Sequence, residues 1–143
     1  MKPTAVLKTN PKVACALNQD LSERPVLSHE QASELECLFK VLANDTRLRI
    51  LHVLARSGEV RVSALCCALG MKPQAVSNQL QRLSDRGIVS SRREGNSVHY
   101  WIADPCIPLL LGYGICLAED SKERRKSGEA IALTDGNGDI ACK

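Results

Sequence analysis

The sequence predicts a mainly α-helical domain that carries one small β-hairpin. Of its 143 residues, 44% are hydrophobic and only 3% are aromatic, which favours an aliphatic, helical core and disfavours both disorder and an all-β sandwich. Apolar residues recur with the helical period through most of residues 29–120, the expected folded domain, and alternate with polar residues only near residues 97–102. Residues 1–28 and 121–143 show no sustained period, so we expect flexible arms there.

Four helices are expected in quick succession before the hairpin. Each carries an apolar stripe at helical spacing. The four stripes are Leu35, Leu38, Phe39 and Leu42; Leu48, Leu51 and Leu54; Val62, Leu65, Cys66 and Leu69; and Val76, Leu80 and Leu83. Asn44 offers an N-cap to the second helix, and Pro73 suits the first turn of the fourth. Gly58, Gly70 and Gly87 are placed to end the second, third and fourth helices.

The chain changes to strand-like alternation after the fourth helix. Apolar and polar residues alternate over residues 97–102, and residues 88–91 can pair with them around a turn at residues 93–96. A last helix is expected from Asp104, with Pro105 in its first turn. Its apolar face contains Cys106, Leu109, Leu110, Tyr113, Cys116 and Leu117. The hairpin therefore lies between the fourth and the last helix.

The basic residues are concentrated where this order of elements would meet DNA. The formal net charge is +3, but residues 61–100 alone hold six Lys and Arg against two Asp and Glu. A helix, a tight turn, a second helix and an arginine-bearing hairpin form a winged helix-turn-helix, whose second helix enters the major groove. A solvated surface can have the same composition. The polar residues lie opposite the buried stripe of the fourth helix, however, and this placement favours binding to double-stranded DNA.

The candidate DNA contacts lie on the fourth helix and in the hairpin. The helix contributes Lys72, Gln74, Ser77, Asn78, Gln79 and Arg82, and the hairpin contributes Arg92 and Arg93. Gln and Asn side chains can bind the N6/N7 edge of adenine, and Ser77 near the helix N-terminus can hold a phosphate. We expect the two hairpin arginines to contact the phosphate backbone or the minor groove.

Several short motifs occur in one unbroken register. They are FKVLANDTRLRIL at residues 39–51, VSAL at 62–65, LG at 69–70, QAVSNQL at 74–80, Leu83, GIV at 87–89, REG at 93–95 and VHY at 98–100. Over residues 32–120 the chain resembles the ArsR/SmtB family of bacterial metal-sensing repressors. The resemblance implies a homodimer built on the first and last helices, an operator with two half-sites, and repression that is relieved when an effector binds.

The family's effector sites are matched only in part. The arsenic-type site on the third helix uses a Cys-Val-Cys sequence, where this chain has Arg61-Val62-Ser63. In the zinc-type site on the last helix, an Asp and a His of one subunit meet a His and a Glu of its partner. Asp104 and Cys106 stand at the first pair of positions. Cys116 and Glu119 have the spacing of the second pair, but each lies one residue before the position that an ungapped alignment gives. Thiolates therefore replace both imidazoles, which favours a soft ion over Zn(II).

Cys106 and Cys116 cannot share an ion within one chain. Ten residues of helix span about 15 Å, whereas metal–sulfur bonds are about 2.3 Å long. Two copies of this helix that cross antiparallel near Leu111 would bring Cys106 of each copy close to Cys116 of the other, and Cys37 could supply a third thiolate. Such a site would take As(III), Cd(II), Pb(II) or Hg(II). Two alternatives stay open: packing without a ligand, and a thiol redox or reactive-sulfur switch in which the two cysteines are oxidised across the interface.

The remaining features argue against a membrane protein and against an enzyme. No apolar run is long enough to cross a bilayer and the N-terminus lacks the apolar stretch of a signal peptide, so we expect a cytoplasmic protein. Seven cysteines, an odd number, fit poorly with a disulfide scaffold in that compartment. The chain has no Cys-x-x-Cys motif and no evident Cys/His pair, which disfavours a thiol enzyme. We therefore expect no catalytic residues and no cofactor that is required for folding.

Overall fold

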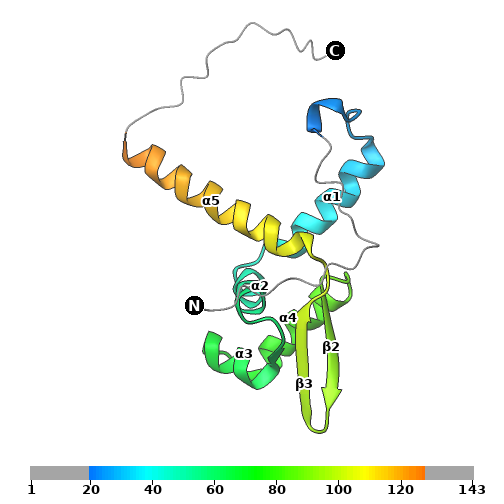
Figure 1. Cartoon of the computed structure of the whole chain (residues 1–143), viewed down its shortest axis with the longest axis vertical. Helices are drawn as coiled ribbons and strands as arrows, with labels where there is room; N and C mark the ends of the chain where they lie inside the picture. Colours follow the sequence, from blue (N-terminus) through cyan, green and yellow to red (C-terminus); the bar gives the residue numbers. More distant parts are fainter. Residues whose placement is uncertain (1–19, 128–143) are drawn as a thin grey trace, which may run out of the picture. The chain divides into compact units, whose positions relative to one another are not determined.

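The computed structural model describes residues 20–127, and its α-helices and its hairpin follow the order that the sequence predicts (Figure 1). They are the 3₁₀ helix η1 (Leu21–Glu23), α1 (His29–Leu42), α2 (Asp45–Ser57), β1 (Val60–Arg61), α3 (Val62–Leu69), α4 (Pro73–Ser84), β2 (Val89–Glu94), β3 (Ser97–Ile102) and α5 (Cys106–Lys126). Most of the two expected arms lies outside the described residues. The described part of the first contains η1, and α5 continues beyond residue 120, where we expected the folded domain to end.

The starts of the first two helices are fixed by side-chain caps. At α1, the Gln31 N–H donates to Ser28 Oγ at 3.2 Å and the Ser28 N–H donates to Gln31 Oε1 at 3.0 Å, a reciprocal capping box. At α2, Asn44 Oδ1 accepts from the Arg47 N–H at 3.0 Å, which confirms the expected N-cap. Each cap satisfies a backbone N–H that the helix itself leaves without a partner.

The turn between α3 and α4 is set by one glycine and one proline. Gly70 ends α3 with φ +64°, a left-handed conformation that costs glycine little. The Met71 N–H donates to the Cys66 carbonyl at 3.0 Å and closes the turn. Pro73 is the first residue of α4, where the missing N–H is not needed. This helix-turn-helix confirms the sequence-based prediction.

The sheet has three antiparallel strands in the order β1-β3-β2. The hairpin of β2 and β3 turns over Gly95 and Asn96, so its strands run closer to the tip than expected. Gly95 has φ +58°, as a two-residue hairpin turn requires. Strand β1 was not expected, because a strand of two residues has no periodicity to detect. It pairs Val60 with Tyr100 and places Arg61 opposite His99.

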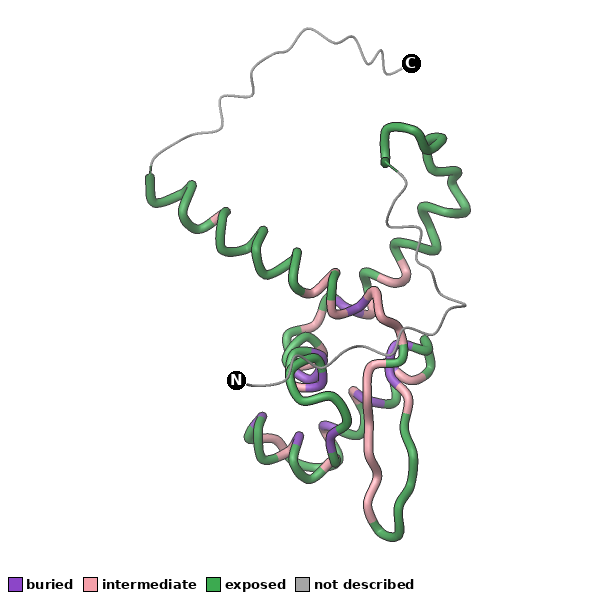
Figure 2. The backbone as a smooth tube through the Cα atoms, in the orientation of Figure 1, coloured by how far each residue is buried: buried purple, intermediate pink, exposed green. Residues whose placement is uncertain are grey.

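The core is aliphatic and lies mainly between α2, α3, α4 and the inner face of the sheet. Figure 2 shows buried positions concentrated on these helices, whereas α1 is exposed along most of its length. The buried side chains are Leu42, Ile50, Leu51, Leu54, Val60, Leu65, Leu69, Val76, Leu80, Leu83, Ile88, Val89 and Ile107. Phe39 is 47% exposed, and Leu35 and Leu48 are also exposed although they belong to expected stripes. Leu42 is buried and Leu38 packs against the core, so Leu35 and Phe39 are the members of the α1 stripe left exposed within the described chain.

Helix α5 is shared between two compact units that divide at residue 111. In the first unit, Ile107 is buried and Leu110 and Leu111 pack against the core. In the second unit, Tyr113 is 69% exposed and Leu117 is 63% exposed. Among residues 20–127, no helix combines the length and the apolar character that crossing a membrane requires.

Candidate nucleic-acid interface and effector site

Helix α4 presents a polar face opposite its buried stripe. Val76, Leu80 and Leu83 hold the helix in the core. The expected contacts Lys72, Gln74, Ser77, Asn78 and Arg82 are all exposed. The Gln74 Nε2 donates to Asn78 Oδ1 at 2.9 Å, so these two amides lie one turn apart on the same face. Gln74 keeps an amide oxygen, and Asn78 keeps an amide nitrogen, for hydrogen bonds to a partner.

Gln79 differs from the other candidates because its side chain is engaged inside the domain. It is half-buried, and its Oε1 accepts from Arg47 Nη1 at 2.9 Å. Arg47 also donates from Nε to the Val41 carbonyl, and from Nη2 to the Lys40 carbonyl at 3.5 Å. Sequence reasoning missed Arg47. The sequence did contain a sign that Gln79 is engaged inside the domain. It lies three residues after Val76, which places it beside the buried stripe of α4.

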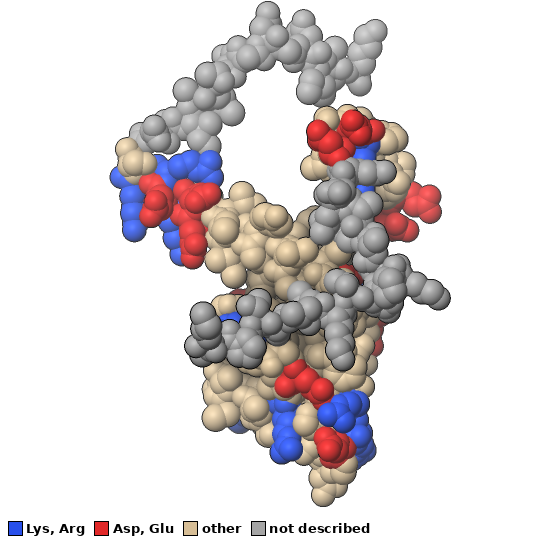
Figure 3. Space-filling model, viewed as in Figure 1, with Lys and Arg blue, Asp and Glu red and all other residues tan. Residues whose placement is uncertain are grey.

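The wing arginines are exposed, and Arg92 is held by two carboxylates. Its Nε donates to Glu59 Oε1 at 2.6 Å, and its Nη2 lies 3.6 Å from Glu94 Oε2. The hydrogen bond with Glu59, followed by the charges of Glu59 and Glu94, raises the pKa of Arg92. Arg93 Nε donates to the Gly95 carbonyl at 3.3 Å. Acidic and basic side chains accordingly alternate over the hairpin (Figure 3).

The expected metal ligands on α5 do not form a site in one chain. Cys106 is half-buried in the first turn, and its N–H donates to Asp104 Oδ1 at 2.8 Å. Asp104 therefore caps α5 rather than beginning it. Cys116 and Glu119 are exposed. Within residues 20–127, no three His, Cys, Asp or Glu side chains are grouped closely enough to hold a metal ion, and no disulfide joins the five described cysteines.

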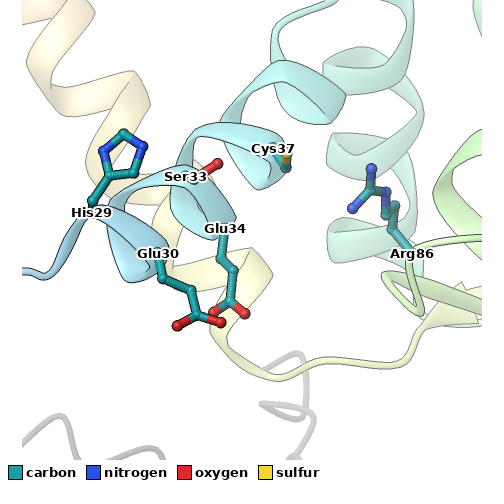
Figure 4. A pocket seen from close by; sticks show the side chains of 6 residues that line it. All are labelled: His29, Glu30, Ser33, Glu34, Cys37 and Arg86. Atoms are coloured by element: carbon teal, nitrogen blue, oxygen red, sulfur yellow. The ribbon is translucent and has the colours of Figure 1, made fainter.

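Cys37 lines an open hollow beside α1. The hollow has a volume of about 440 Å³ and is lined by His29, Glu30, Ser33, Glu34, Cys37 and Arg86. In Figure 4 the other lining residues project from α1, whereas Arg86 projects from the segment between α4 and β2, across from Cys37. Of the expected metal ligands, only Cys37 lies here. Cys37 is half-buried, so its sulfur is partly accessible to a ligand.

The helix-turn-helix, the polar face of α4 and the basic hairpin together define a winged helix-turn-helix DNA-binding protein. A model of the MarR family matches residues 44–97. The arsenical resistance operon repressor of Escherichia coli is 41% identical over 71 residues, and an SmtB-type repressor of Synechocystis is 39% identical over 79 residues. These two matches cover 50% and 55% of this chain, and only 60% and 59% of the relatives.

Two further relatives are matched over more of their length. The arsenic resistance transcriptional regulator ArsR1 of Pseudomonas putida is 33% identical over 98 residues, which are 68% of this chain and 76% of that protein. The crystal structure of the antimony-specific repressor AntR is 55% identical with a TM-score of 0.66, and the match covers 77% of this chain and 99% of AntR. The chain belongs to the ArsR/SmtB family of transcriptional repressors, which are DNA-binding regulators and not enzymes.

Proposed function

We propose that the protein is a cytoplasmic, homodimeric repressor that leaves its operator when cysteine thiolates at the dimer interface bind a soft metal or metalloid ion. The observation that carries the DNA-binding role is the exposed polar face of α4, which follows a glycine-ended turn and precedes an arginine-bearing wing. Family membership supports the role of repressor.

Helix α4 is suited to reading bases in the major groove. The Gln74 and Asn78 amides support one another, which leaves an acceptor on Gln74 and a donor on Asn78. Adenine presents the complementary pair, an N6 donor and an N7 acceptor. Lys72, Ser77 and Arg82 would hold phosphates on either side, with Arg92 and Arg93 reaching the backbone or minor groove from the wing. Gln79 would contribute to DNA binding by holding α4 in place and not by contacting a base, because its side-chain oxygen accepts a hydrogen bond from Arg47.

A homodimer is supported by the apolar side chains that a single chain leaves exposed. Leu35 and Phe39 are exposed on α1, and Leu109, Tyr113 and Leu117 are exposed on α5. Large apolar patches on a folded domain mark interaction surfaces. A winged-helix domain of Mycobacterium bovis that is 35% identical to this chain, with a TM-score of 0.59, was solved as a homodimer. Two copies would also present two recognition helices to successive turns of the operator.

The effector site then uses residues of both copies. Cys106 of one copy and Cys116 of the other supply two thiolates, and Cys37 supplies a third; Asp104 and Glu119 are the nearby oxygen ligands. Each copy alone lacks a three-ligand group in its described part, which supports a site shared between copies. Three thiolates suit a trivalent metalloid, and the relatives named for arsenic and antimony support As(III) or Sb(III) ahead of Cd(II), Pb(II) and Hg(II).

Titration of the protein–DNA complex tests this function. Fluorescence anisotropy would follow reduced protein on DNA from upstream of its own gene while As(III), Sb(III), Cd(II), Pb(II), Hg(II) or Zn(II) is added. Cys106→Ser and Cys116→Ser should bind DNA as the parent does and resist release. Cys67→Ser, an exposed cysteine on α3, is the matched control and should respond as the parent does.

Two outcomes would contradict the proposal. Release that persists in Cys106→Ser would place the effector elsewhere. Binding that ignores every ion but is lost on oxidation and regained with a reductant in metal-free buffer would indicate the thiol redox switch instead.

A further inference from the structure

We propose that Glu59 holds the wing arginine Arg92 away from DNA, and that His99 makes their contact, and with it DNA binding, depend on protonation. The inference rests on the proposed DNA-binding role of the wing. In the structure, Arg92 Nε donates to Glu59 Oε1 at 2.6 Å, and Arg92 Nη2 lies 3.6 Å from Glu94 Oε2. The Glu59 carboxylate therefore occupies an Arg92 donor that a DNA phosphate could use, and the Glu94 carboxylate pairs with the guanidinium charge.

The Arg92–Glu59 ion pair spans the middle strand of the sheet. Strand β3 lies between β1 and β2, Glu59 directly precedes β1, and Arg92 belongs to β2. The residue of β3 opposite Arg92 is His99. The His99 side chain is only 12% exposed, so its imidazole is largely covered even though it lies on the face of the wing that is turned away from the core.

His99 is placed between the same two carboxylates. Its Nδ1 lies 3.4 Å from Glu59 Oε1, and its Nε2 lies 3.5 Å from Glu94 Oε2. The Nε2 is buried, and within residues 20–127 it has no hydrogen-bond partner. Glu59 Oε1 is thus approached by two possible donors, one from Arg92 and one from His99.

The strand register identifies the charged groups that share this face of the sheet with His99. Arg61 of β1 is opposite His99 in the strand register, and Arg92 and Glu94 come from β2, with Glu59 directly before β1. Alternate residues of β3 point to the other face, where Tyr100 and Ile102 pack against the core beneath α2, α3 and α4.

Protonation of His99 changes which group holds Glu59. A neutral imidazole donates from one nitrogen only, and then Arg92 is the cation that neutralises both carboxylates. When His99 takes up one proton, both ring nitrogens become donors, each already near a carboxylate oxygen. His99 then competes with Arg92 for Glu59 Oε1, and the guanidinium is released toward solvent and phosphate. Acidification therefore tightens DNA binding, with one proton taken up for each wing.

Binding to operator DNA at about pH 6 and pH 8 tests this exchange, since histidine changes its charge between about pH 5 and pH 8. The parent should bind operator DNA roughly three- to tenfold more tightly at the lower pH. This range corresponds to the exchange of two exposed ion pairs, one in each subunit of a dimer. The slope of log K against log salt should become steeper by about 0.9 for each wing. Glu59→Gln should already bind tightly at the higher pH and gain little on acidification. His52→Gln, on the exposed face of α2, is the matched histidine control.

Arg92→Gln separates the exchange from a simple added charge on His99. Without the arginine the acid-induced gain should disappear, as it should in His99→Gln. A full gain in Arg92→Gln would overturn the proposal, because His99 would then act on DNA by its own charge. Weaker binding in Glu59→Gln would also overturn it, since Glu59 would then hold Arg92 in its DNA-bound position.

A measurement without DNA keeps this test separate from the proposed function. In the free protein, the NMR signal of the Arg92 Nε–Hε group should shift with pH in step with the His99 ring signals. That shift should be lost in His99→Gln. If the Arg92 signal does not change with pH together with the His99 ring signals, the proposal is overturned, whether or not the protein binds DNA. If the two sets of signals do change together but the protein binds no DNA, only the proposed function is refuted.

Discussion

Arg47 and Arg92 each join segments that are more than thirty residues apart in the sequence. Arg47 links the end of α1 to Gln79 of α4, and Arg92 links β2 to Glu59. Neither contact could be predicted from the sequence, because helical spacing shows which residues share a face and not which side chain crosses to another element. The N-cap of Asn44 could be predicted, since a cap acts on a backbone N–H only a few residues away.

Removing the Arg47 guanidinium should destabilise the domain. Arg47→Met keeps much of the side chain's length but leaves the Gln79 oxygen and two carbonyls without this donor. We expect the free energy of unfolding to fall by about 1–3 kcal/mol, as for other partly buried hydrogen bonds to a charged group. Urea denaturation measures the change. Arg56→Met, an exposed arginine at the end of the same helix, should stay within about 0.5 kcal/mol of the parent.

Truncating Asn78 should weaken specific DNA binding without weakening the fold. Asn78→Ala removes a base-reading amide and the acceptor for Gln74, so operator affinity should fall by roughly five- to 150-fold, equivalent to about 1–3 kcal/mol. Binding to unrelated DNA should change little, because phosphate contacts supply it. Anisotropy with both DNAs measures the difference. Equal losses on both would show that Asn78 contacts the backbone, and Gln81→Ala on the same helix should behave as the parent does.

At the scale of elements, the helices and the hairpin were predictable because their apolar periods extend over several turns or pairs of residues. Strand β1 was not, since Val60 and Arg61 form a strand only by pairing with β3. The α1 stripe was recognised as apolar, but only the family resemblance placed this helix in a dimer interface. The period of Leu35 and Phe39 shows that a face is apolar, but it does not show whether the same chain or a second copy covers it.

The anchoring of α4 gives a prediction at this scale. Leu80 lies on the buried face of the recognition helix and is fully buried, so Leu80→Ala should cost about 2–5 kcal/mol of unfolding free energy. Leu48, which is partly exposed on α2, should lose clearly less on the same substitution. Thermal or urea unfolding of both variants checks the order. Similar losses would mean that Leu48 is covered in solution, as in a dimer.

At the scale of the whole molecule, the apolar residues left exposed predict association. Tyr113 lies in the second unit of the chain and is mostly exposed, so a single chain gains nothing from its ring. Tyr113→Glu should therefore shift the protein toward monomer in sedimentation equilibrium and reduce operator affinity. Tyr113→Phe keeps the apolar ring and should remain dimeric. A parent protein that is monomeric at micromolar concentration would contradict the prediction.

The candidate effector site could be predicted only as a set of residues. Cys106 and Cys116 were singled out by the resemblance to the family's zinc-type site, and their separation along one helix shows that they need a second copy to share an ion. The position of Cys37 relative to them depends on how two chains meet, which periodicity does not encode. The structure adds that Asp104 caps α5 and that Cys37 lines an open hollow.

The most direct test of a site shared between copies is metalloid binding by a mixed dimer, with one subunit carrying Cys106→Ser and the other Cys116→Ser. If each site joins Cys106 of one copy to Cys116 of the other, both substitutions fall in one site and the second site remains whole. Measured with Sb(III) or As(III), the mixed dimer should bind one ion, the parent dimer two, and either pure variant none at comparable affinity. A mixed dimer that binds no ion, while the parent binds two, would contradict a site shared between the two copies.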